Sequence, residues 1–262
     1  RRQRQMCIRD SHHPDPSEPS NLTHLIKAVK DKNADIGIAL DGDGDRLGVV
    51  DSEGKIIFPD RYLALMASEI LRKNKSRKIV YDIKCSNQLG QVIKENNGIP
   101  IMTKTGHSYI KSEISKSNAI LGGEMSGHIF YNDNWYGFDD GIFAALKLLE
   151  ILSSKESTTH EVFNKFTQLF NTPEIKIAVE DDEKFEIVEQ LKVKLKPEGY
   201  NSILIDGLRL ENKDCWGLVR ASNTTPSLIL RFEANTEQKL MEIQELFQKT
   251  LLEISTNLKF LN

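Results

Sequence analysis

Helical and strand-like apolar patterns alternate through the middle of the chain, and this alternation constrains the fold more than any other feature of the sequence. The helical spacings fall at 62–72, 86–95, 108–115 and 140–152, with strand-like runs at 78–83, 99–103 and 119–122 between them. Such spacing is typical of βαβ crossovers, which cover a mostly parallel sheet with helices. We therefore predict an α/β fold for this part of the chain.

Prolines and changes of pattern indicate the domain boundaries. Residues 1–11 are rich in arginine and have no periodic apolar pattern, so we expect a disordered or non-native tail there. Pro59 and the pair Thr172-Pro173 mark two further boundaries. The expected divisions are 12–58, 59–170 and 171–262, and the last of these is predicted to be a smaller α+β domain that ends in an amphipathic helix.

Composition narrows the classes of function. The chain has 35 lysines and arginines and 38 aspartates and glutamates, so its net charge is −3. This charge excludes a strongly basic protein, and we therefore expect neither nucleic acid nor an anionic membrane as a partner. No apolar run approaches the roughly 20 residues that a membrane-spanning helix needs. The three cysteines are odd in number and far apart, as is typical of reduced thiols, and we expect a cytoplasmic protein.

A glycine-spaced acidic loop gives the densest chemical signal. Asp41, Asp43 and Asp45 alternate with glycines after a strand-like run, so their carboxylates can converge on one point. A hard divalent cation relieves the repulsion between them, and oxygen ligands favour Mg²⁺ or Ca²⁺. An EF-hand needs Gly and Glu where this chain has Arg46 and Ser52. We predict a Mg²⁺ loop, with a hydrated acidic turn as the alternative.

A second polar loop spans residues 122–128 and follows another strand-like run. Glu124, Ser126 and His128 occupy alternate positions in it. They combine hydrogen-bond donors with acceptors, as recognition of vicinal sugar hydroxyls requires. The alternative is a glycine-rich hairpin in which His128 has only a structural role.

A third polar loop follows a strand near the end of the chain. Arg220, Ser222, Asn223 and Thr224 supply a guanidinium, hydroxyls and an amide, and the loop adds free backbone N–H groups. These groups suit a phosphate dianion. The alternative is a polar turn between strands.

Lys84 and His107 lie near predicted strand ends, where α/β sheets place ligands. The alternatives are a solvated lysine and a histidine that only begins a helix.

Taken in this order, the loops DGDGDR, GEMSGH and RASNTTP resemble those of the α-D-phosphohexomutase family, as do the segments HHPDPSEPSNL, DIKCSNQL and TGHSYI. The resemblance covers the chain from about residue 12 onward. It implies mixed α/β sheet domains of the phosphohexomutase type, with the end of domain II at 12–58 and domain III at 59–170. A C-terminal α+β domain IV would follow at 171–262.

The resemblance also implies an activity. Family members are phosphotransferases of the isomerase class that interconvert the 1- and 6-phosphates of a hexose through a phosphoserine and a 1,6-bisphosphate. The phosphoserine belongs to the family's first domain, in a T-x-S-H-N-P-type loop that this sequence lacks. We therefore expect this chain to be a C-terminal portion that is inactive alone and that needs a serine domain as its partner.

Roles for individual residues follow from the resemblance and not from spacing. Asp41, Asp43 and Asp45 are expected to bind Mg²⁺, and Arg46 to support the same charge. The sugar is expected to be bound by Glu124, Ser126 and His128, and the phosphate by Arg220, Ser222, Asn223 and Thr224. Lys84 and His107 are expected to line the site as catalytic residues. Of these, His107 is the expected proton carrier.

The choice of substrate depends on a small feature. GEMSGH resembles the phosphomannomutase/phosphoglucomutase branch, whereas Gln in place of Met125 would indicate phosphoglucosamine mutase. The expected ligands are mannose or glucose 1- and 6-phosphates and the hexose 1,6-bisphosphate. The alternatives are a phosphoglucosamine mutase and a non-catalytic sugar-phosphate-binding protein that lost the serine domain.

Overall fold

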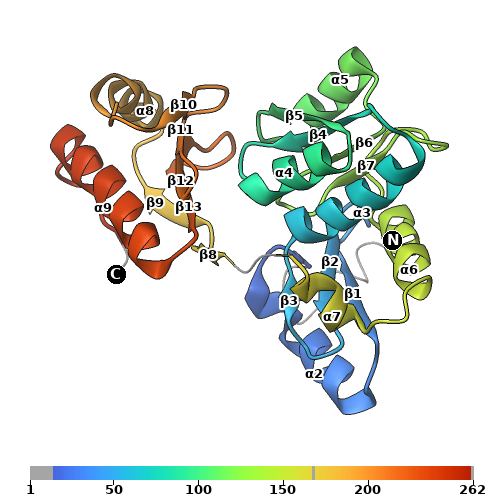
Figure 1. Ribbon diagram of the computed structural model, residues 1–262. Helices are drawn as coiled ribbons and strands as arrows, with labels where there is room; N and C mark the ends of the chain where they lie inside the picture. The colour runs from blue at the N-terminus through green and yellow to red at the C-terminus, as the bar shows by residue number, and fades with distance from the viewer. Residues whose placement is uncertain (1–13, 167–168, 261–262) are drawn as a thin grey trace, which may run out of the picture. The chain divides into compact units, whose positions relative to one another are not determined.

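The structure, a computed structural model, describes residues 14–166 and 169–260, which form two compact units that divide near residue 167 (Figure 1). The predicted tail, 1–11, lies outside the described residues. The elements of the first unit are η1 (Pro19–Leu22), α2 (Thr23–Lys32), β1 (Ile36–Leu40), β2 (Leu47–Asp51), β3 (Ile56–Ile57), α3 (Pro59–Lys73), β4 (Lys78–Asp82), α4 (Asn87–Glu95), β5 (Ile99–Thr103), α5 (His107–Ser117), β6 (Leu121–Gly123), β7 (Ile129–Tyr131), α6 (Gly141–Ser153) and α7 (Thr159–Asn164). The elements of the second unit are β8 (Phe170–Asn171), β9 (Ile175–Ala178), α8 (Glu183–Lys194), β10 (Asn201–Ile203), β11 (Leu208–Glu211), β12 (Cys215–Ala221), β13 (Ser227–Ala234) and α9 (Glu237–Ile254).

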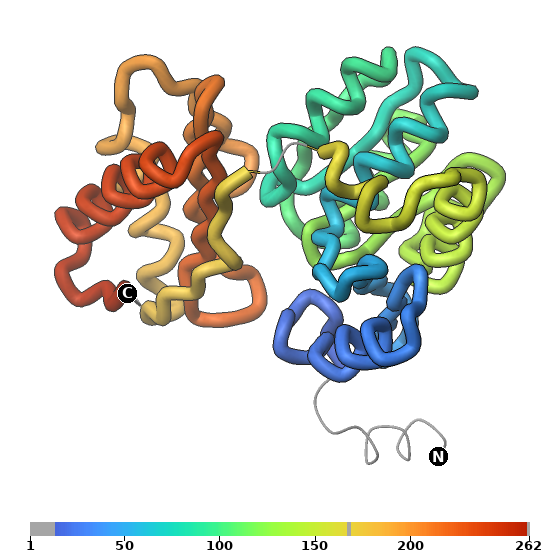
Figure 2. Tube along the Cα trace, turned by 60° about the horizontal axis from the view of Figure 1, so that its bottom comes forward, coloured from blue at the N-terminus to red at the C-terminus, as the bar shows by residue number. Residues whose placement is uncertain are grey.

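A small antiparallel sheet, β1-β2-β3, begins the first unit. Figures 1 and 2 show α2 packed beside it, and Val29 of α2 shares a small apolar core with Val50 of β2. Leu40 pairs with Leu47, so residues 41–46 form the loop of a hairpin. The acidic loop is therefore held at the end of two paired strands.

A four-stranded sheet with the order β5-β4-β6-β7 forms the centre of the first unit. β4 pairs parallel with both β5 and β6, as the alternating pattern predicts, whereas β7 is an antiparallel strand that the sequence patterns did not indicate. Helix α5 packs on one face through Ile110 and Ile114, and α3 packs on the other through Leu63. Because β4, β5 and β6 are parallel, the loops that follow them leave the sheet at the same edge.

Capping residues mark where several of the helices begin. Ser86, Asp140 and Thr236 each accept a backbone N–H bond at the start of α4, α6 and α9, as short polar side chains at this position commonly do. Pro59 is the first residue of α3, where its missing N–H costs nothing. Helix α3 therefore begins three residues before the predicted helix at 62–72.

The second unit is an antiparallel sheet with helices on one face. The strand order is β10-β11-β12-β13-β8, and β9 also pairs with β13. Helices α8 and α9 share a core with the strands, in which Phe247 of α9 meets Phe232 of β13 edge to face. Ala221 pairs with Leu228, so the predicted phosphate loop closes a β12–β13 hairpin. The predicted fold class, an α/β region followed by an α+β domain, is confirmed.

Candidate active site

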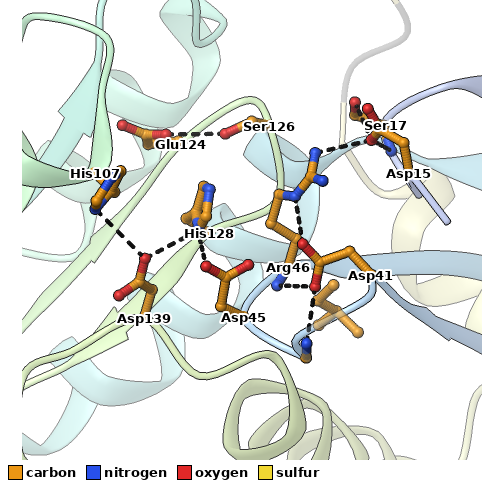
Figure 3. A network of polar contacts seen from close by, with 12 residues as sticks. Asp15, Ser17, Asp41, Asp45, Arg46, His107, Glu124, Ser126, His128 and Asp139 are labelled. Atoms are coloured by element: carbon orange, nitrogen blue, oxygen red, sulfur yellow. Dashed lines mark hydrogen bonds and ion pairs between the residues drawn. The ribbon is translucent and has the colours of Figure 1, made fainter. Parts of the chain in front are cut away.

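The acidic loop is fixed by its own backbone and by Arg46. Oδ1 of Asp41 accepts hydrogen bonds from the backbone N–H groups of Gly44 and Arg46, both at 3.1 Å. Oδ2 of Asp41 accepts from Nε of Arg46 at 2.7 Å, and the same guanidinium reaches Oδ1 of Asp15 at 2.9 Å (Figure 3). Arg46 therefore joins the loop to the segment that precedes η1.

The three aspartates of this loop can hold a metal ion. Asp41, Asp43 and Asp45 each offer a carboxylate oxygen, and these oxygens lie within 4.8 Å of one another. Burial opposes ionisation of Asp41, but hydrogen bonds from Arg46 outweigh it and lower the pKa to about 2. Burial, followed by the neighbouring carboxylates of Asp41, Asp43 and Asp139, raises the pKa of Asp45 to about 7. An all-oxygen cluster in which Asp45 is still repelled by its acidic neighbours fits a hard divalent cation.

A backbone bridge joins the acidic loop to the predicted sugar loop. Arg46 and His128 form an isolated β-bridge, and the N–H of Leu47 donates to the carbonyl oxygen of Gly127 at 3.0 Å. Gly127 has φ +102°, and a Cβ at this position would lie 2.8 Å from the carbonyl oxygen of Leu47. A glycine is therefore required for the two loops to approach this closely.

Glu124 is the most buried polar residue of the sugar loop, with 3% of its surface exposed. Its Oε1 accepts from the N–H of Gly106 at 2.7 Å, and its Oε2 accepts from Oγ of Ser126 at 2.9 Å. Burial and then the charge of Asp82 raise the pKa of Glu124 to about 7, against the opposing effects of these two donors and of Lys84. At neutral pH the protonated and the ionised form of this carboxyl group are therefore both populated, and the protonated form can also donate a hydrogen bond.

The imidazole of His128 faces the acidic loop. Its Nδ1 lies 3.1 Å from Oδ2 of Asp139 and 3.6 Å from Oδ2 of Asp45 (Figure 3). Asp139 also accepts from Nζ of Lys111 at 3.1 Å and lies 3.9 Å from Nδ1 of His107. Burial lowers the pKa of His128, although the charge of Asp139 opposes this shift.

Asp139 is a candidate site residue that our sequence analysis did not select. It lies just before α6, where the adjacent Asp140 is the N-cap. One aspartate is enough to cap a helix, so the second aspartate of this pair was the feature of the sequence that could have indicated a further role.

Lys84 and His107 take different positions at the sheet edge. Lys84 lies in the turn after β4 with only 8% of its surface exposed, and its charge acts on Glu124. His107 is the first residue of α5 rather than a residue before the helix, and 56% of its side chain is exposed. Its ring centroid lies 5.8 Å from that of His128.

The predicted phosphate loop lies in the second unit. Nε of Arg220 donates to Oδ2 of Asp206 at 2.8 Å, while Nη2 is buried and has no hydrogen-bond partner among the described residues. Oγ of Ser222 accepts from the N–H groups of Thr224 at 3.3 Å and Thr225 at 3.1 Å, which shapes the turn. Asn223 and Thr224 are exposed at its tip.

The predicted residues thus form two groups. In the first unit, the structure brings together Asp41, Asp43, Asp45, Arg46, Lys84, His107, Glu124, Ser126 and His128, which come from the hairpin loop and from the common edge of the parallel sheet. Arg220, Ser222, Asn223 and Thr224 form a compact turn in the second unit.

Comparison with known proteins identifies the class to which this fold and these loops belong. The chain matches domain II of phosphoglucomutase/phosphomannomutase over residues 5–54, the α/β/α domain III over 58–170 and the C-terminal domain over 174–249. The chain belongs to the phosphoglucomutase/phosphomannomutase family. The predicted resemblance to phosphohexomutases is therefore confirmed.

Individual relatives support the same family. The chain is 48% identical over 248 residues to a phosphomannomutase/phosphoglucomutase of Pseudomonas aeruginosa, covering 95% of the chain and 54% of the relative. It is 49% identical over 250 residues to a phosphoglucomutase of Neisseria meningitidis, with the same coverage of 95% and 54%. A solved family structure from Burkholderia thailandensis gives a TM-score of 0.89 at 43% identity, covering 95% of this chain and 54% of that one. The chain spans about half the length of the curated relatives it matches.

Among the described residues, no helix has the length and apolar character needed to cross a bilayer.

Proposed function

We propose that the chain is the later part of a phosphomannomutase/phosphoglucomutase. The complete enzyme would move phosphate reversibly between the 1- and 6-positions of a hexose through a phosphoserine and a 1,6-bisphosphate. The phosphoserine would come from a region that this sequence does not include. The observation that carries the proposal is the bridge from Arg46 to His128, because it holds a three-carboxylate loop against a loop that can bind sugar hydroxyls.

Asp41, Asp43 and Asp45 would hold the metal ion, which we propose to be Mg²⁺. When bound, this ion supplies positive charge that neutralises the oxygens of a phosphoryl group during transfer. Arg46 supports the same charge from within the loop, since its guanidinium is held between Asp41 and Asp15.

Glu124 and Ser126 would bind the sugar hydroxyls in either orientation of the hexose. The hydrogen bond from Gly106 fixes the position of the Glu124 carboxyl, and the Ser126 hydroxyl supplies a second polar group 2.9 Å away. His128 and His107 both lie near Oδ2 of Asp139, at 3.1 Å and 3.9 Å, and are the candidates for carrying a proton. Lys84 adds a positive charge near Glu124.

The loop after β12 would hold the phosphate that is not reacting. The buried Nη2 of Arg220 lacks a hydrogen-bond partner among the described residues, and a phosphate oxygen would supply one. Ser222 keeps the turn closed, so that Asn223 and Thr224 can direct their polar groups toward the anion.

Glucose and mannose phosphates are the proposed substrates, in preference to glucosamine phosphate. The side chain of Met125 packs against the core of the first unit and offers no strong hydrogen-bond partner to an amine. Cys85 and Cys215 are both buried thiols that form no disulfide among the described residues, which supports a reducing compartment such as the cytoplasm.

Binding to the chain itself tests the proposal. With Mg²⁺ present, calorimetry should detect glucose 6-phosphate or mannose 6-phosphate binding more tightly than glucosamine 6-phosphate. Glu124→Gln should weaken hexose phosphate binding about tenfold while leaving inorganic phosphate binding unchanged. The matched control is Glu95→Gln, which alters an exposed glutamate at the end of α4.

Two results would contradict the proposal. Equal affinities of Glu124→Gln and the unchanged chain for hexose phosphates would remove the sugar-binding role of this loop. Tighter binding of glucosamine 6-phosphate would favour the phosphoglucosamine alternative. The chain alone should not convert glucose 1-phosphate, since it lacks the serine loop, and measurable turnover would overturn that part of the proposal.

A further inference from the structure

A buried carboxylate connects three loops at the edge of the parallel sheet. Asp82 is the last residue of β4 and has 0% of its surface exposed. Its Oδ1 accepts from Sγ of Cys85 at 3.1 Å and from the N–H of Met125 at 3.3 Å. Its Oδ2 accepts from Oγ1 of Thr105 at 3.2 Å. The three donors come from the turns that follow β4, β5 and β6.

Each of these turns also carries a residue of the candidate site. Lys84 precedes Cys85, His107 follows Thr105 by two residues, and Glu124 precedes Met125. The loops are connected a second time, because the N–H of Gly106 donates to Oε1 of Glu124 at 2.7 Å. The arrangement of the sugar loop relative to the His107 loop therefore depends on two buried carboxylates side by side.

The position of Asp82 is not explained by packing. An ionised carboxylate is costly to bury unless hydrogen bonds or charges compensate it, and an apolar residue of similar size would fill the same volume at lower cost. The donors that surround Asp82 are a thiol, a hydroxyl and one backbone N–H, each from a different turn. Burial of this carboxylate thus costs stability, but its hydrogen bonds fix the three turns relative to one another.

We propose that Asp82 is a positioning residue for the sugar-binding site: its carboxylate holds the turns of Lys84, His107 and Glu124 in one arrangement. What the site binds rests on the proposed function, whereas the positioning role does not.

The charge of Asp82 has a separate consequence for Glu124. The groups that act on Glu124 are Asp82 at the end of β4, Lys84 in the following turn, Gly106 before α5 and Ser126 of its own loop. Burial comes first among the causes that raise the pKa of Glu124, and Asp82 comes next. Removal of the Asp82 charge should therefore make Glu124 easier to ionise.

Hydrogen exchange on the ligand-free chain tests the connection between the turns. Thr105→Val removes the hydroxyl donor while keeping the shape of the side chain, and we expect exchange of the Gly106 amide to accelerate about fivefold or more. Thr103→Val is the matched control, since it makes the same change at the end of β5, where the backbone of Thr103 pairs with β4 and its hydroxyl has no hydrogen bond among the described residues. Unchanged exchange at Gly106, or equal acceleration in the control, would overturn the proposal.

A second variant tests the charge. Asp82→Asn retains the size and much of the hydrogen-bonding capacity of Asp82, and its effect is read from the carboxyl ¹³C shift of Glu124 during a pH titration. We expect the pKa of Glu124 to fall by about one unit or more. An unchanged pKa of Glu124 would show that the charge of Asp82 does not act on the site. Neither readout requires a ligand, so failure of the proposed function would leave both results standing.

Discussion

Nδ1 of His128 lies 3.1 Å from Oδ2 of Asp139, and the two residues come from opposite ends of the segment that contains β7. Lys111 of α5 holds the other carboxylate oxygen of Asp139 at 3.1 Å. The imidazole thus lies within ion-pair distance of a carboxylate that is itself held by a helix, and its buried Nδ1 makes no hydrogen bond among the described residues. A carboxylate at this distance favours the protonated form of the ring, so Asp139 acts on His128 through its charge.

Replacement of Asp139 should make His128 harder to protonate. Burial lowers the pKa of His128, and the negative charge of Asp139 partly offsets this effect. In the metal-free Asp139→Ala chain we expect the pKa of His128 to fall by about one unit or more, as measured by NMR titration of the ring protons. Asp133→Ala, which removes a carboxylate from the same connection between β7 and α6, should leave His128 within about 0.3 of its original value. A rise, or no change, in Asp139→Ala would show that Asp139 does not act on the ring.

Glu124 should make the stability of the first unit depend on pH. Its pKa is raised by burial to about 7, so between about pH 4.5 and 7 the folded state holds a proton that the unfolded state has released. Stability is therefore present below this window and decreases as the pH rises through it, by about 3 kcal/mol in total. Glu124→Gln does not titrate and should gain stability relative to the unchanged chain between pH 5 and pH 8 in urea unfolding. With Glu95→Gln the difference should be the same at both pH values.

Mg²⁺ binding should require the release of a proton from Asp45. The pKa of Asp45 is raised to about 7 by burial and by its acidic neighbours, so the affinity for Mg²⁺ should increase between pH 6 and pH 8. Asp43→Asn should weaken binding about tenfold or more, because a charged ligand is lost. Asp35→Asn, at an exposed residue before β1, is the control. Calorimetry in buffers of different ionisation enthalpy would reveal the proton, and its absence would contradict this prediction.

Arg220 should account for much of the phosphate affinity of the second unit. Its Nε is held by Asp206, and its buried Nη2 has no partner among the described residues, so an anion gains a preformed donor. Arg220→Ala should raise the dissociation constant for glucose 6-phosphate about tenfold. Arg72→Ala removes an exposed guanidinium in α3 and should have no effect. Equal affinities of the Arg220→Ala and Arg72→Ala chains would dismiss the assignment of this loop.

The sequence predicted the loops better than it predicted what surrounds them. Local patterns were sufficient to locate the three polar loops, because each follows an apolar run and is six or seven residues long, whereas the roles of their residues stay predictions. Asp82 and Asp139 were not predicted, because their partners are far away in the sequence. Asp82 bonds to Met125, which is 43 residues away, and Asp139 bonds to Lys111, which is 28 residues away. Such pairs are defined only after β4, β5 and β6 have paired.

Short elements also escaped prediction. Strand β7 has only three residues, Ile129–Tyr131, and helix α7 only six, Thr159–Asn164, which is too short for periodicity to be read. Tertiary contacts stabilise α7 instead: Thr159 bonds to the backbone of residues 35 and 52, and His160 bonds to the buried Asp51. The long helices α3 and α6 were anticipated within about three residues at either end, and the closing helix α9 was anticipated as amphipathic, because their apolar spacing and N-terminal signals agree.

Two glycines of the second unit allow a controlled test of how the phosphate loop is supported. Gly207 and Gly199 both have φ +81°, so alanine adopts a left-handed conformation at either position. At Gly207 a Cβ would lie 2.2 Å from the carbonyl oxygen of Val219 and 2.7 Å from Cα of Arg220, whereas at Gly199 nothing lies within 4 Å. The difference between the two variants therefore isolates the close approach of the Asp206-Gly207 turn to β12.

We expect Gly199→Ala to cost about 1 kcal/mol of unfolding free energy, which is the conformational penalty alone. Gly207→Ala should cost about 2 kcal/mol more, because the turn must move away from β12. The measurement is urea unfolding followed by the fluorescence of Trp216 in a Trp135→Phe background. Since the same turn carries the partner of Arg220, Gly207→Ala should also weaken phosphate binding, and Gly199→Ala should not. Equal losses of stability in the two variants would mean that the turn yields without strain and that Asp206 does not depend on it to reach Arg220.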